Sequence, residues 1–333
     1  MLQFDLDHQS DVMYAIHSFV DECLNLDMSD QDFIHDLERL YCAFEVFNQE
    51  GLQYAASIRA FIAVMEHVNS QRGVLSLGEY LSGLTKDEIK FLRRILHTHR
   101  GLIREEINRF IRQKELNRDG LFDEFEGAIK GYYSVLVIRV DLGYSKDSLS
   151  KITVRDFYLH IDRLRAAITD KNGCFDALVT YAITLEQGIT KGFHAHLALV
   201  VNRSKHQNDH CIAHGVIEKW KDITLGMGSG WNNNTSENKA NYQRQGRLGI
   251  GDICRTEPEQ GNNALCAVAY LSDPEKYDQM LLIKPQSRNT FNKGDYQYHG
   301  RSIPDTAENR RIKDWNAQTA LAKLQEDIWF KKL

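Results

Sequence analysis

The feature that most constrains the fold is a pair of alternating segments, residues 178–186 and 193–201, joined by the short link QGITKG. Apolar and polar residues alternate along both segments with the period of two that is typical of a β-strand. The link contains two glycines, which suit a tight reversal of the chain. The pattern therefore predicts a hairpin with a shared apolar side, formed by these residues: Tyr181, Ile183, Leu185, Phe193, Ala195, Leu197, Leu199 and Val201.

The opposite side of this hairpin carries Glu186, His194 and His196. The two histidines are two positions apart, so on an extended strand they project from one face, about 6.6–6.8 Å apart. Two imidazoles and a carboxylate can hold a divalent metal ion, whereas the His-x-His triplet alone could equally have a structural role. His97 and His99 lie in a predicted helix, where positions two apart diverge by about 200°, and we interpret them as part of a solvated helix face.

Several short motifs follow one another in an order that resembles the HUH endonucleases, closest to the inovirus-type replication proteins and their prophage relatives. The motifs are LVIRVDLGY (136–144), LEQGITKGFHAHLALVVN (185–202), WKDITLGMGSG (220–230), LGIGDI (248–253) and AVAYLSD (267–273). The resemblance covers roughly residues 130–300. It implies an enzyme that nicks and rejoins single-stranded DNA at the origin of a phage-like or plasmid-like element and so initiates rolling-circle replication.

The resemblance also implies roles for individual residues. Glu186, His194 and His196 match the metal ligands, and Mg²⁺ or Mn²⁺ suits this mixed nitrogen and oxygen set. Tyr270 matches the nucleophile, which would form a 5′-phosphotyrosyl link and leave a free 3′-hydroxyl. Tyr277 is the alternative nucleophile. For each tyrosine, a place in the core or at an interface is the competing interpretation.

The chain departs from the family pattern three residues after Tyr270. Relatives usually carry a lysine there, on the same helix face, whereas this sequence has Asp273. The stretch SDPEKYDQMLL predicts a new helix, with Asp273 as N-cap and Pro274 in its first turn. Lys276 could then supply the missing positive charge from that second helix.

The surrounding segments predict an α+β fold, HUH-like or Rep-like, with an antiparallel sheet covered by helices on one face. Residues 133–142 predict a strand in which Arg139 and Asp141 share one face, so that they could line the metal site or form a cross-strand ion pair. Residues 153–167 predict an amphipathic helix. This arrangement would leave the second sheet face free for single-stranded DNA.

Two polar stretches are candidates for DNA contacts. Residues 226–249 are rich in Gly and Asn and predict a loop, in which Trp231, Tyr242, Arg244 and Arg247 could stack on bases and hold phosphates. An ordinary surface loop is the competing interpretation. Residues 284–302 are rich in Arg, Lys and Tyr and predict a segment that follows the DNA backbone, with His299 outside the metal site.

Helical periodicity, the absence of proline before residue 257 and uneven charge divide the chain into regions. Residues 1–125 predict an all-helical N-terminal region, residues 130–300 the nuclease domain, and residues 301–333 a tail with a terminal helix. Residues 1–66 contain 13 acidic and 2 basic side chains, whereas residues 86–118 contain 10 basic and 5 acidic ones. The acidic part could bind a protein partner such as a host replication factor. The basic part could face duplex DNA or the sheet groove, or be a solvated helix face.

Composition excludes several classes of protein. No segment approaches the ~20 apolar residues of a membrane span, and the acidic N-terminus has no apolar signal core, so we expect no membrane partner and a cytoplasmic protein. The six cysteines form no Cys-x-x-Cys pair, which argues against a zinc ribbon or a disulfide framework. Other functions stay open: a relaxase or transposase with the same chemistry, a DNA-binding regulator that has lost cleavage, and a metal hydrolase of the amidohydrolase type.

Overall fold

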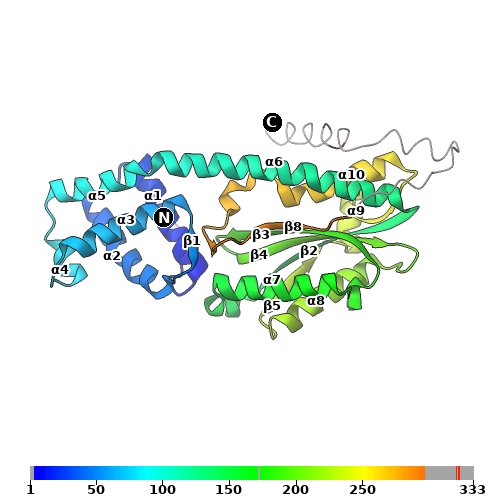
Figure 1. Cartoon of the computed structure of the whole chain (residues 1–333), viewed down its shortest axis with the longest axis horizontal. Helices are drawn as coiled ribbons and strands as arrows, with labels where there is room; N and C mark the ends of the chain where they lie inside the picture. The colour runs from blue at the N-terminus through cyan, green and yellow to red at the C-terminus, as the bar shows by residue number, and fades with distance from the viewer. Residues whose placement is uncertain (1–3, 172, 297–319, 321, 323–333) are drawn as a thin grey trace.

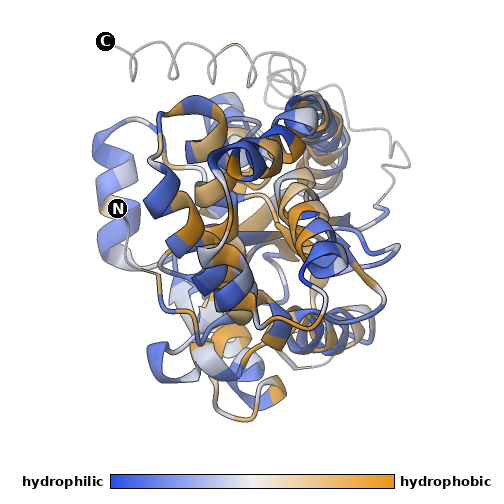
Figure 2. Ribbon diagram, turned by 90° about the vertical axis from the view of Figure 1, so that its left-hand side faces the viewer, coloured by the Kyte–Doolittle hydropathy of each residue, from blue (hydrophilic) through white to orange (hydrophobic). Residues whose placement is uncertain are grey.

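The computed structural model describes residues 4–171 and 173–296, together with Ala320 and Ala322 (Figure 1). The predicted domain 301–333, including its terminal helix, and His299 therefore lie outside the described residues apart from those two alanines. The N-terminal region contains these helices: α1 (Gln9–Asn25), α2 (Asp30–Phe47), α3 (Ala56–Gln71), α4 (Leu77–Ser82) and α5 (Lys86–Thr98). Figure 2 shows that their hydrophobic faces turn inward and their hydrophilic faces outward.

The prediction that this region is all-helical is wrong in one place. Strand β1 (Leu52–Tyr54) pairs antiparallel with β7 (Ile283–Pro285), more than two hundred residues further along the chain. Ala55 also donates a backbone hydrogen bond to Leu282. A three-residue strand is too short to show a periodic pattern in the sequence. Its partner also lies far away along the chain, so no local hairpin signal reveals the pairing.

The central sheet has six antiparallel strands in the order β5-β2-β4-β3-β8, with β6 also paired to β2. Its strands are β2 (Ser134–Tyr144), β3 (Leu178–Gly188), β4 (Gly192–Asn202), β5 (Gly228–Asn232), β6 (Gly251–Cys254) and β8 (Phe291–Lys293). The predicted hairpin is confirmed, since Glu186 pairs with His194 and Thr184 with His196 across β3 and β4. Gly192 has a φ of 60° at the end of the hairpin turn, a conformation that suits glycine. These observations establish the mixed α+β class.

One face of the sheet is covered by α7 (Val154–Thr169) and α8 (Asp209–Ile223), which lie below it in Figure 1. The predicted helix at 153–167 is thus confirmed as α7, and it begins with a capping box between Thr153 and Asp156. Its buried side chains pack on the apolar row of the sheet, and the same core continues into α1 and α3. The N-terminal region and the sheet therefore share one hydrophobic core.

The prediction of a free second face is wrong, because helices cover both sides. Helix α6 (Arg100–Gly131) is 32 residues long and runs above the sheet in Figure 1, beside α10 (Pro258–Ala269). The side chains that close this face come from both helices and three strands: Leu121, Phe122, Phe125, Val135, Val137, Ala182, Ala198, Val200, Val268 and Ala269. The small and β-branched residues among them let α6 and α10 approach the sheet closely. Burial of all these apolar side chains favours a covered face over an open groove.

Two further segments differ from their predictions. Residues 226–249 contain β5 and the helix α9 (Ser236–Arg244), whose first turn is capped by Thr235. The helix predicted after Asp273 is one turn, η4 (Lys276–Gln279), and Asp273 accepts the backbone N–H of Glu275 as a turn residue. The remaining short turns are η1 (Lys146–Lys151), η2 (Gly173–Phe175) and η3 (Tyr270–Ser272). Within the described residues, no helix has the length and apolar character needed to cross a membrane.

Candidate metal centre and tyrosine site

The predicted metal ligands, on β3 and β4, converge on one point of the sheet face that α6 covers. Suitable atoms of Glu186, His194 and His196 lie within 4.8 Å of one another, and all three residues are buried. The Nε2 atoms of His194 and His196 lie 3.8 Å and 3.1 Å from Oε2 of Glu186. The prediction that adjacent strands bring these three groups together is confirmed.

The donor atoms of the two imidazoles fit a metal ion. Both Nε2 atoms are buried and face the Glu186 carboxylate without a well-aligned hydrogen bond in the described structure, an arrangement that is costly unless an ion lies between them. The Nδ1 atoms are occupied: that of His194 lies 3.1 Å from the carbonyl oxygen of Gly192, and that of His196 lies 2.6 Å from Oδ1 of Asp141. Such outer contacts fix the tautomer in which Nε2 presents its lone pair to a metal.

The ionisation of these groups favours ligands ready to bind. Burial, and next the charge of His196, lower the pKa of His194 to about 4, so this imidazole is neutral at neutral pH. Burial raises the pKa of Glu186, but His196, Lys114 and Lys276 together hold it far below its usual value. Burial also raises the pKa of Asp141, and the hydrogen bond and charge of His196, with Arg139, more than offset this. The two carboxylates are therefore ionised.

Two lysines neutralise Glu186. Lys276 on η4 places Nζ 3.0 Å from Oε2 of Glu186. It thus supplies the positive charge that relatives carry at the position of Asp273, although Lys276 lies on a single turn and not on the predicted helix. Lys114 on α6 lies 3.4 Å from Oε1 and also contacts Thr184 and the carbonyl oxygen of Leu271. Burial lowers the pKa of both ammonium groups, whereas Glu186 opposes this shift.

Sequence reasoning missed Lys114. It lies within a basic stretch that has many solvated charges, and this concealed it. A signal was present, since Leu121 and Phe125 follow it at seven and eleven positions, on the same helical stripe. A lysine on an apolar stripe must reach a buried partner, and here that partner is Glu186.

The structure brings Tyr270 next to the candidate metal ligands. Its ring lies 5.1 Å from the ring of His196, centroid to centroid, in an edge-on arrangement. Two cations lie over the same ring, with Lys276 Nζ at 3.3 Å and the guanidinium carbon of Arg139 at 4.8 Å from its centroid. Burial, and next the charges of Glu186 and Asp141, raise the pKa of the Tyr270 phenol.

The other predicted contacts are more dispersed. Tyr277, on η4, has a 52% exposed side chain and follows directly after Lys276, which points to Glu186. Trp231 is 62% exposed on the edge strand β5, opposite Asp141 in register. Arg247 and Tyr242 line a cavity beside Tyr270, whereas Arg244 is exposed at the end of α9.

Comparisons of the chain with models of protein families, with curated proteins and with solved structures find no match. The established result is therefore a buried group of one carboxylate and two imidazoles that could hold a metal ion.

Proposed function

We propose that this protein is a metal-dependent endonuclease and strand transferase of the HUH type, which nicks and rejoins single-stranded DNA to initiate rolling-circle replication. The observation that carries the proposal is the contact between Tyr270 and His196, because it places a phenol beside the candidate metal ligands. The order of motifs along the chain supports the choice of substrate. Relaxase and transposase chemistry uses the same centre and differs in the DNA that is cut.

The proposed step is a transesterification at one phosphate of the DNA. The bond between Oη of Tyr270 and phosphorus forms as the bond from phosphorus to the 3′-oxygen breaks. The phenolic proton passes to solvent, and the 3′-oxygen takes up a proton to become a hydroxyl. The phosphotyrosyl ester conserves the energy of the broken bond, so the reverse step rejoins the strand.

The surrounding residues suit this step. Burial, and next the charges of Glu186 and Asp141, raise the pKa of Tyr270 and favour its protonated form, and Lys276 and Arg139 would stabilise the negative charge that develops on the ring oxygen and phosphate during the step. Glu186, His194 and His196 would hold Mg²⁺ or Mn²⁺, which withdraws charge from a bound phosphate. Asp141 orients His196 for that role.

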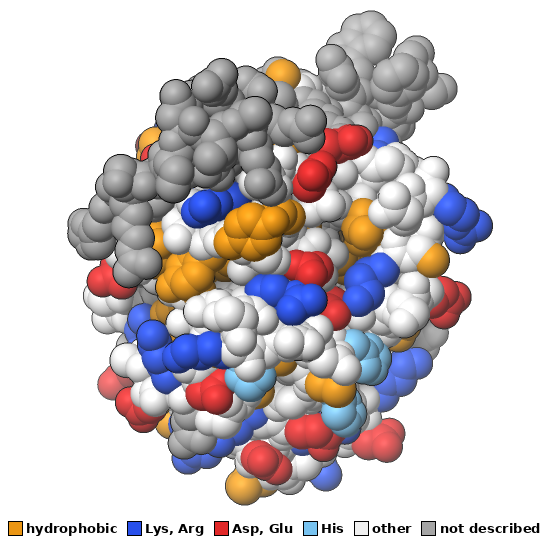
Figure 3. Space-filling model, turned by 90° about the vertical axis from the view of Figure 1, so that its right-hand side faces the viewer, with side chains coloured by type: hydrophobic (Ala, Val, Ile, Leu, Met, Phe, Trp, Pro, Cys, Tyr) orange, Lys and Arg blue, Asp and Glu red, His pale blue; other side chains and the backbone are white. Residues whose placement is uncertain are grey.

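Binding of DNA would depend on local charge, because the chain as a whole has a net charge of −5. Figure 3 shows basic and acidic side chains interspersed on one end of the molecule. Arg139 and Lys276 add two cations directly at Tyr270. We therefore expect short-range contacts at the site, more than a long-range field, to position the strand.

The test uses a pool of single-stranded DNA of random sequence, incubated with the full chain and Mn²⁺. We expect a protein–DNA adduct that survives boiling in detergent, that needs the divalent ion and that disappears in Tyr270→Phe but not in Tyr277→Phe. The reverse pattern would move the nucleophile to Tyr277. DNA binding without any adduct would favour a regulator that has lost cleavage.

A further inference from the structure

A cavity of about 500 Å³ lies beside Tyr270 and is distinct from the metal centre. Its walls come from segments far apart in the sequence, including Arg118 on α6, Tyr242 on α9 and Asn263 on α10. Tyr270 and Asp141 line it too, and these two residues also contact His196. A group bound in the cavity would therefore lie next to a phosphate held at Tyr270.

The cavity contains cationic groups suited to a phosphate. Arg139 lines it while its guanidinium lies over the ring of Tyr270. Arg118 lines it as well, and its Nε is buried without a hydrogen-bond partner in the described part of the chain. A buried guanidinium nitrogen without a partner is costly, and a phosphate oxygen is the acceptor that Arg binds best.

Part of the remaining wall suits a nucleobase, and the carboxylates of Asp273 and Glu275 lie elsewhere on the lining. Tyr242 offers a half-buried ring on which a base can stack, and Gln245, the C-cap residue of α9, follows three positions later. Asn233, after β5, adds a second amide. Amide side chains pair with the edges of bases, and ~300–1,000 Å³ is the usual size of a pocket for a small molecule. Cations, a ring and amides in one cavity together match a nucleotide.

We propose that this cavity holds one nucleotide of single-stranded DNA adjacent to the phosphate that Tyr270 attacks, with its base stacked on Tyr242 and its edge facing Gln245 and Asn233. The inference rests on the proposed function, because it assigns part of that substrate to the cavity. It predicts that the base next to the nick is recognised directly.

The test begins with a DNA sequence recovered from the adduct, resynthesised with a single abasic site at each position around the nick. For the parent chain, we expect one abasic position adjacent to the nick to lower the adduct yield about tenfold or more. Tyr242→Ala should lower the yield on intact DNA and lose this positional difference, whereas Tyr242→Phe, which keeps the ring, should retain the positional difference. Gln245→Ala, at an exposed position, should change which base is preferred.

Equal tolerance of abasic sites on both sides of the nick, or a positional difference that persists in Tyr242→Ala, would overturn the cavity proposal and leave nicking intact. If no DNA gives an adduct, the proposed function fails, and binding of deoxynucleoside monophosphates to the full chain decides about the cavity. Binding that Tyr242→Ala abolishes and Tyr242→Phe retains would support a nucleotide site. Absence of binding would overturn it.

Discussion

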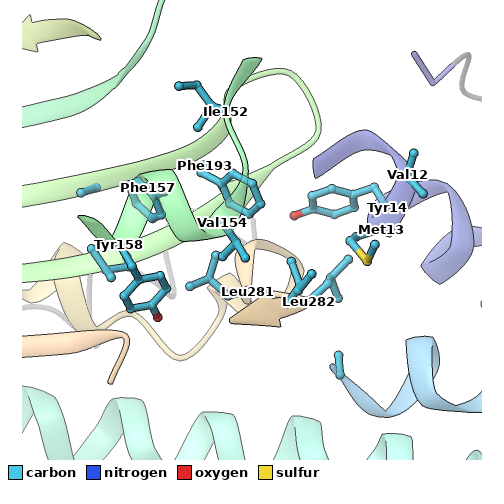
Figure 4. Packing of buried hydrophobic residues seen from close by; sticks show 14 of the residues in the cluster. Val12, Met13, Tyr14, Ile152, Val154, Phe157, Tyr158, Phe193, Leu281 and Leu282 are labelled. Atoms are coloured by element: carbon cyan, nitrogen blue, oxygen red, sulfur yellow. The ribbon is translucent and has the colours of Figure 1, made fainter. Parts of the chain in front are cut away.

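The two faces of the central sheet differ in what they contribute. On the face toward α7, the side chains of β2 from Leu136 to Leu142 and those of β4 are apolar, and Figure 4 shows Phe157 and Phe193 packed there beside residues from α1. On the face toward α6, Val135 and Val137 are apolar, but Arg139 and Asp141 follow on the same strand. One face and half of the other stabilise the fold, and the remaining polar half holds the candidate metal site.

This difference shows how a buried charged group is tolerated. Glu186 and the two lysines around it are each less than a tenth exposed, and such burial is unfavourable unless the charges are paired. The apolar area on the other face offsets that cost. Substitutions on the two faces should therefore separate stability from activity.

The largest effect on stability is expected on the apolar face. Phe157 is fully buried and stacks on Phe193 with ring centroids 5.7 Å apart. Phe157→Ala should lower the free energy of unfolding by about 3–5 kcal/mol, measured by urea denaturation, because a cavity replaces the ring. Leu159→Ala, at a 48% exposed position on the same helix, is the control and should change it by no more than ~0.5 kcal/mol. Adduct yield per folded molecule should stay at the parent level in both variants.

A smaller effect, of the opposite kind, is expected on the polar half. Asp141→Asn removes the carboxylate that orients His196, so Mn²⁺ affinity measured by calorimetry should fall about 10–100-fold with little loss of stability. Asp252→Asn, on the exposed edge strand β6, should leave the affinity unchanged. Equal affinities in the two variants would mean that Asp141 does not support the site.

The smallest effect concerns pH. His160, on α7, hydrogen bonds with the Tyr144 hydroxyl at 2.9 Å, and burial lowers its pKa. The folded state then binds fewer protons than the unfolded state below the ordinary imidazole pKa of about 6.5. The contribution of His160 to the free energy of unfolding is therefore complete above that pH and is lost as the pH falls below it. In His160→Gln, the free energy of unfolding should depend less steeply on pH in this window, and an unchanged slope would contradict this assignment.

The sequence predicted the parts of the site that a short segment contains. Glu186, His194 and His196 lie within one hairpin, so a period of two was enough to place them together. Asp141 was placed on the same face by the alternation of a single strand. Local periodicity decides such cases because the backbone itself brings the residues together.

Parts assembled over long sequence distances could not be predicted in this way. Lys114 reaches Glu186 through a helix that crosses the sheet, and only tertiary packing brings them together. The same helix closes the face that we expected to be open. In residues 226–249, the density of Gly and Asn masked β5, whose pairing with β2 supplies the hydrogen bonds that its local propensity does not favour.

The pairing of β1 with β7 ties the first sixty residues to the stretch that follows Tyr277. The Tyr14 hydroxyl adds a second tie, since it lies 2.6 Å from the carbonyl oxygen of Gln187 and 2.7 Å from that of Asp278. Trimming the chain to its sheet would expose an unpaired edge and strip the hairpin end of its support. A fragment that folds on its own is therefore not to be expected from this architecture, and the two halves should unfold as a single cooperative unit.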